Sequence, residues 1–213
     1  MKTEYVTDQS LGEEIANSIS HGLGAVGGMV ALPFLIINAI PHGAAAIVGA
    51  SVFGAAIIIM YLSSTLYHAF PVSRVKKLFQ IFDHSAIYIL IAGTYTPFAL
   101  GILQGFWGWV MLTVMWTLAA AGIVFKSIAG TRKNIRSTIL YVAMGWMGIL
   151  MIKPLMSNME REGLYWLLAG GVSYTAGVIF YLMKRLPYAH FIWHLFVLGG
   201  TACHVVTVMR FAN

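Results

Sequence analysis

Two pairs of polar residues, far apart in the sequence, repeat the spacing of one helix turn. His190 and His194 are four residues apart, and so are Ser64 and His68. Residues at positions i and i+4 lie on one face of an α-helix, so each pair presents both side chains to the same neighbour. Two imidazoles one turn apart can bind one Zn²⁺, and a third completes the ligand set of a catalytic zinc site. With His68 as the natural third ligand, we predict a zinc site held by His68, His190 and His194. A single His-x3-His pair can instead serve interhelical hydrogen bonds.

Asp83 is the one carboxylate within the apolar runs of the chain. A carboxylate inside a membrane span costs about 2.5–3.5 kcal/mol on insertion scales, so it needs a partner or a position near the interface. Beside a zinc ion, Asp83 would hold or deprotonate the water that zinc acidifies. We therefore interpret Asp83 as catalytic, with Ser64 as a second catalytic candidate. Ser64 can instead donate a hydrogen bond to the carbonyl of Met60 on its own helix.

A third set of polar residues, Glu14, Asn17 and His21, continues the pattern at i+3 and i+4. These residues can form a hydrogen-bonded network around the metal, or they can cap and solvate the entrance of the first helix. Two further histidines fit the site less well. His84 follows Asp83 but points about 100° away around the helix, and His204 is expected to pack or hydrogen-bond in the outer half of the membrane.

The composition requires that these residues be held inside a membrane. Of the 213 residues, 59% are hydrophobic and 9% are charged, against about 25% charged in ordinary soluble domains. A soluble fold of this composition would expose large apolar patches, so a soluble enzyme is excluded. The single cysteine, Cys203, excludes a disulfide framework and a multi-cysteine zinc site. The net charge of +6 reflects the placement of basic residues around a membrane, and no nucleic-acid partner is expected.

Seven apolar runs are long enough to cross a hydrocarbon core that takes about 20 helical residues. The runs are Ser20–Ile40, Ala44–Phe70, Leu78–Leu103, Phe106–Ile128, Ser137–Met156, Leu164–Met183 and His190–Phe211. Residues 20–213 are thus predicted to form one domain of seven transmembrane helices. Residues 1–19 lack the apolar core of a signal peptide and are predicted to form a cytoplasmic segment. A short interfacial helix is expected in it, because Ser10 and Glu13 have the spacing of a capping box.

Basic residues predict the orientation of the bundle. With the N-terminus inside, ten basic residues face the cytoplasm and three face outward, as the positive-inside rule requires. The cytoplasmic ones are Lys2, Arg74, Lys76, Lys77, Lys126, Arg132, Lys133, Arg136, Lys184 and Arg185, and the outer ones are Lys153, Arg161 and Arg210. The sequence therefore predicts an all-α integral membrane protein, a seven-transmembrane helix bundle with a cytoplasmic N-terminus and the C-terminus outside. This topology brings Glu14, His68, Asp83 and His190 to the same leaflet, which favours a single site.

Three motifs on these segments resemble a known family. Glu14-x2-Asn17-x3-His21, Ser64-x3-His68 followed by Asp83, and His190-x3-His194 are similar to the motifs of the hemolysin III branch of the progestin and adiponectin receptor family. The resemblance covers essentially the whole chain. It implies a seven-helix bundle with zinc on His68, His190 and His194, and with Asp83 reaching the metal through water. The residue matching Ser64 would then support the site or assist the substrate. The wider group includes alkaline ceramidases, in which such a zinc site cleaves a lipid amide.

The function predicted from the sequence is a zinc-dependent membrane hydrolase that cleaves an amide or ester of a membrane lipid. The lipid would enter from the inner leaflet through a hydrophobic cavity near His68. The main alternative is a non-catalytic sensor or receptor-like protein of membrane homeostasis with structural zinc. A proton or ion pathway and a pore-forming hemolysin are further alternatives. The expected location is the cytoplasmic (inner) membrane of a bacterium, and the oligomeric state stays open.

Overall fold

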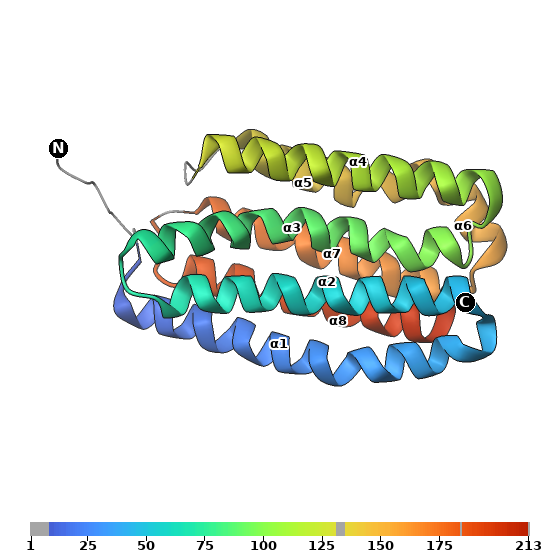
Figure 1. The fold of residues 1–213 in the computed structure, drawn as a ribbon, viewed down its shortest axis with the longest axis horizontal. Helices are drawn as coiled ribbons and strands as arrows, with labels where there is room; N and C mark the ends of the chain where they lie inside the picture. The colour runs from blue at the N-terminus through green and yellow to red at the C-terminus, as the bar shows by residue number, and fades with distance from the viewer. Residues whose placement is uncertain (1–8, 131–134, 184, 213) are drawn as a thin grey trace.

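The fold is a bundle of long helices. The computed structural model describes residues 9–130, 135–183 and 185–212, and all regular structure in these ranges is helical. The elements are α1 (Leu11–Ala39), η1 (Ile40–His42), α2 (Ala44–Ala69), α3 (Arg74–Leu100), α4 (Gly105–Ala129), α5 (Ile135–Gly145), η2 (Met147–Met151), α6 (Ile152–Asn158), α7 (Arg161–Leu182) and α8 (Ala189–Phe211). The long helices run along one common direction (Figure 1). The predicted all-α class is confirmed.

Six helical segments of the described chain are long and apolar enough to cross a membrane. They are Leu11–His42, Ala44–Ala69, Gly105–Ile128, Ile135–Asn158, Arg161–Leu182 and Ala189–Phe211. Each corresponds to one of the predicted spans. The protein is therefore an all-α membrane protein with several spans.

The predicted span that is missing from these six is the third, which corresponds to α3. At 27 residues α3 is long enough to cross a membrane, but its polar side chains lower its mean hydropathy. These polar residues are buried within the bundle: Asp83, His84, Ser85, Thr94 and Thr96. α3 packs between α2 and α4, so it needs less apolar surface than a helix that faces lipid.

Contacts between neighbouring helices close the bundle into a ring. α2 packs against α1 and α3, α4 packs against α3, and α8 packs against α1 and α7, while α5 touches α3, α4 and α7. The backbones of α2 and α3 nearly touch, because a Cβ atom on Gly49 would lie 2.8 Å from the Cα of Pro97. The N-terminal end of α1, the α2–α3 turn and the α7–α8 connection all lie at the left end of the bundle in Figure 1.

The fifth predicted span is interrupted. A 3-10 segment, η2, separates α5 from α6. Tyr95 of α3 forms hydrogen bonds with backbone groups at this interruption. The Tyr95 hydroxyl lies 3.0 Å from the carbonyl oxygen of Met144 and 2.8 Å from that of Gly145, and it accepts a hydrogen bond from the Gly148 N–H at 2.9 Å. A polar side chain from a neighbouring helix thus makes irregular backbone tolerable at membrane depth.

The start of α1 follows the predicted capping box. The Ser10 side chain accepts from the Glu13 N–H, and the Glu13 side chain accepts from the Ser10 N–H. α1 then continues to Ala39, so the helix expected near Leu11 leads into the first span without a break. Residues 1–8 of the predicted N-terminal segment lie outside the described residues, as do four of the basic residues used for the orientation: Lys2, Arg132, Lys133 and Lys184.

Candidate metal centre

Three histidines from two helices converge at one end of the bundle. Each of His68, His190 and His194 offers a nitrogen, and these three atoms lie within 4.8 Å of one another. His68 stands near the end of α2, and the other two occupy the first turns of α8. The ring centroid of His68 is 5.2 Å from that of His190 and 5.1 Å from that of His194. The three predicted ligands are therefore close enough to hold a metal ion.

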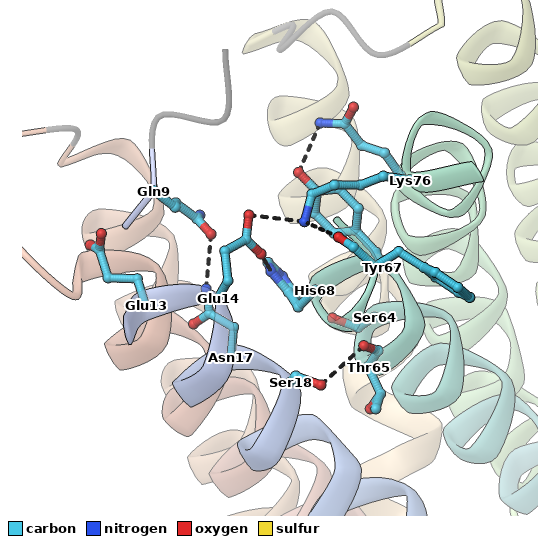
Figure 2. Close-up of polar contacts among 12 residues, drawn as sticks. Gln9, Glu13, Glu14, Asn17, Ser18, Ser64, Thr65, Tyr67, His68 and Lys76 are labelled. Atoms are coloured by element: carbon cyan, nitrogen blue, oxygen red, sulfur yellow. Dashed lines mark hydrogen bonds and ion pairs between the residues drawn. The ribbon is translucent and has the colours of Figure 1, made fainter. Parts of the chain in front are cut away.

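A carboxylate on α1 fixes the orientation of His68. The Nδ1 atom of His68 lies 2.7 Å from Oε2 of Glu14 (Figure 2). An ionised carboxylate only accepts hydrogen bonds, so Nδ1 is the donor in this contact, and the neutral form of His68 then has its lone pair on Nε2. Among the described residues, this buried Nε2 has no hydrogen-bond partner. The other oxygen of Glu14 lies 3.0 Å from the ammonium of Lys76.

A serine on α1 fixes His194 in the same way. The Ser20 hydroxyl donates to the backbone carbonyl of Asn17 at 2.9 Å, and its oxygen lies 3.2 Å from Nδ1 of His194. Because the hydroxyl has one proton, its oxygen accepts the second bond, and Nδ1 of His194 is the donor. Nε2 of His194 is buried and has no partner in the described part of the chain. Buried polar atoms rarely stay unpaired, so the lone pairs of His68 and His194 fit a bound cation.

The predicted catalytic residues lie beside this cluster. Ser64 is fully buried, and its hydroxyl lies 2.7 Å from Nδ1 of His21. The Asp83 carboxylate is buried and lies close enough to Ser64 and His68 to interact with both. His21 stacks on His194 with 3.5 Å between ring centroids. α1, α2 and α3 therefore meet in one buried polar network next to the histidines.

The remaining candidates lie outside the group of three histidines. Asn17 is buried, and its amide donates to Oε1 of Gln9 at 3.0 Å. His204 donates from Nε2 to the carbonyl of Leu167 at 3.3 Å, which agrees with the expected hydrogen-bonding role. The backbone carbonyl of His84 accepts from the Tyr141 hydroxyl at 2.9 Å.

A largely apolar cavity of about 380 Å³ lies between α3, α5, α7 and α8. Its walls include Trp193 and Tyr181, whose rings lie 4.9 and 6.0 Å from that of His190. Two side chains of the cavity wall thus lie next to His190, although none of the three histidines itself lines the cavity. Its volume lies within the usual range of small-molecule pockets.

Three residues of this network were missed by the sequence analysis: Ser20, Lys76 and Lys126. The two lysines were assigned to the charged cytoplasmic rim, yet Lys76 is 5% exposed and Lys126 is 2% exposed. Lys126 of α4 interacts electrostatically with Asp83. A sequence signal existed only for Ser20, which directly precedes His21. Serines are too common in helices for this position alone to predict a role at the site.

The sequence was compared with known families and proteins. The family model described as "Haemolysin-III related" matches residues 9–205. The chain belongs to the haemolysin III family. It is 52% identical over 203 residues to "Hemolysin-3" of Bacillus cereus, with 94% of this chain and 93% of the relative covered. It is 47% identical over 198 residues to the "Hemolysin-3 homolog" of Bacillus subtilis (strain 168), with 92% and 93% covered.

A more distant relative of this haemolysin III protein is human. The "Monocyte to macrophage differentiation factor" of Homo sapiens is 28% identical over 170 residues, which cover 75% of this chain and 68% of the relative. This match supports the predicted relationship to the progestin and adiponectin receptor family. Together with the six apolar helices, the bacterial relatives support a multi-pass integral membrane protein.

Proposed function

We propose that this haemolysin III protein is a zinc-dependent membrane hydrolase that cleaves an amide or ester bond of a lipid. The observation that carries the proposal is the convergence of His68, His190 and His194. The buried Nε2 atoms of His68 and His194 lack a partner among the described residues. Neutral imidazole nitrogens in a group of three suit zinc and leave a coordination position for chemistry. When bound, zinc would polarise the carbonyl group and acidify a water molecule.

The residues around the histidines would move the protons. The Asp83 carboxylate, buried beside the cluster, would accept a proton from the attacking water and return it to the leaving group. Ser64 would hold Asp83 in place, because its hydroxyl can donate to the carboxylate while accepting from Nδ1 of His21. Glu14, Ser20 and Asn17 would orient the histidine ligands from the side of the imidazole rings that faces away from the metal, as partners of metal-bound histidines commonly do.

The apolar cavity supports a lipid as the substrate. An acyl chain between α3, α5, α7 and α8 would place its polar end beside Trp193 and His190. The cavity has few polar groups to bind a soluble substrate, and hydrophobic burial would supply most of the binding free energy.

The proposed topology has seven spans, with the N-terminus in the cytoplasm and the C-terminus outside. α3 would cross as the seventh span, because 27 helical residues extend about 40 Å at 1.5 Å per residue. The metal centre would then lie near the inner leaflet of a bacterial cytoplasmic membrane, which the two Bacillus relatives support.

Metal content and turnover together test this function. We would measure zinc by mass spectrometry, and hydrolysis of lipid amides and esters, for wild type, His194→Ala and Asp83→Asn in detergent. We expect about one zinc per chain in wild type and in Asp83→Asn, and loss of zinc in His194→Ala. We expect Asp83→Asn to lower turnover by about 10²–10⁴-fold, the usual contribution of general acid–base catalysis.

Two outcomes would contradict the proposal. Absence of zinc in wild type would exclude the zinc hydrolase. Zinc without turnover on any lipid amide or ester would instead favour the sensor with structural zinc.

A further inference from the structure

Lys76 is a buried lysine at the start of α3, and its ammonium joins three helices. Lysine is rarely buried unless it is paired. Its Nζ atom lies 3.0 Å from Oε1 of Glu14 on α1 and donates to the carbonyl of Phe70, the residue after α2, at 3.1 Å. It also lies over the ring of Tyr67, 4.9 Å from the centroid. Ser73 caps α3 by accepting from the Lys76 N–H, so the backbone that carries this side chain is fixed.

The two oxygens of Glu14 are divided between Lys76 and His68 (Figure 2). One oxygen accepts from the ammonium, and the other accepts from the imidazole Nδ1–H. Glu14 is buried, and a buried carboxylate is costly unless an opposite charge compensates it. Lys76 is the cation that keeps Glu14 in this position.

We infer that Lys76 is a positioning residue of the metal centre. It holds Glu14 against Nδ1 of His68, and Glu14 in turn keeps Nε2 of His68 directed at the nitrogens of His190 and His194. Lys76 therefore acts on metal affinity through Glu14. The inference rests on the proposed function only in requiring that the three histidines bind a metal, and it does not require hydrolysis.

A double-mutant cycle on zinc affinity tests this inference. The variants are Lys76→Met, Glu14→Ala and the double variant, each compared with wild type by zinc competition against a chelator in detergent. Lys77→Met is the matched control, because this neighbouring lysine is exposed. We expect Lys76→Met to weaken zinc binding about tenfold, the lower end of the range for residues that support metal ligands. We expect Lys77→Met to change it less than twofold.

The cycle separates action through Glu14 from a general structural role. If Lys76 acts through Glu14, the double variant binds zinc no more weakly than Glu14→Ala alone. A second readout needs no metal: in ¹⁵N NMR of the metal-free protein, we expect His68 to carry its proton on Nδ1 in wild type and to populate both tautomers in Lys76→Met.

Each contrary result has a distinct meaning. Wild-type zinc affinity and an unchanged His68 tautomer in Lys76→Met, even with a lower melting temperature, would overturn the inference and leave Lys76 as a helix-packing residue. Additive losses in the cycle would also overturn it. Failure of wild type to bind zinc would overturn both the inference and the proposed function, whereas zinc binding without hydrolysis would overturn the hydrolase alone.

Discussion

The hydrogen bonds of the Ser20 hydroxyl determine which nitrogen of His194 carries the proton. Since the hydroxyl proton is donated to the carbonyl of Asn17, the serine oxygen can only accept from Nδ1 of His194. Glu14 has the same effect on His68 through a carboxylate. α1 thus contributes no nitrogen to the group of three histidines, yet it sets the tautomers of two of them.

Ser20→Ala should weaken zinc binding by about tenfold, because the support of one ligand is lost. Ser18→Ala is a suitable control, since the Ser18 hydroxyl donates to the carbonyl of Thr65 at 3.2 Å and touches none of the three histidines. Zinc competition against a chelator would measure both variants. Equal affinities for the two would show that the Ser20 contact has no influence on His194.

The three histidines could be predicted at the residue scale, but their supports could not. The i, i+4 spacing fixes which side chains share a helix face, and the predicted topology brings those faces to the same end of the bundle. The pairing of Lys76 with Glu14, and the approach of Lys126 to Asp83, depend on how far each helix is rotated and shifted against its neighbours. A lysine near a predicted helix end looks like a loop charge until the packing is known.

The break between α5 and α6 shows how one helix supports irregular backbone in another. In lipid no water is available to the carbonyls of Met144 and Gly145 or to the N–H of Gly148. The Tyr95 hydroxyl lies within hydrogen-bond distance of all three groups. Tyr95→Phe removes this partner and should lower the free energy of unfolding by about 1–3 kcal/mol.

Unfolding in mixed micelles would measure this change. Tyr165→Phe is the matched control, because the Tyr165 side chain is exposed on α7. Equal stability of the two variants would indicate that another group takes over the backbone atoms at the break.

Apolar runs predicted the positions of the helices well, because a membrane span must be both long and apolar. The break within the fifth span could not be predicted, since its stability comes from Tyr95 on another helix. The nearby Pro154 falls at the third residue of α6, in the first turn, where a missing N–H costs little.

The side of the membrane on which the C-terminus lies depends on whether α3 crosses. With seven spans and a cytoplasmic N-terminus, alkaline phosphatase fused after Gln104 or after the last residue should be active, because both positions face outward. A fusion after Gly130 should be inactive in phosphatase assays, and a fluorescent protein fused there should fold in the cytoplasm. An inactive phosphatase after Gln104, inserted there within the full-length chain so that α4 is present, would show that α3 does not cross the membrane.

Burial of polar residues along α3 also bears on how the nascent chain enters the bilayer. If α3 crosses the membrane, Asp83 adds at most about 2.5–3.5 kcal/mol, the cost at the centre of a span, to the insertion free energy of α3 on its own. Its compensating contacts come from Ser64 on α2 and Lys126 on α4, so they exist only once both neighbours are in place. We therefore expect α3 to leave the translocon together with α2 and α4. In that case, the third helix becomes stable in lipid in the same step that assembles the polar network around the histidines.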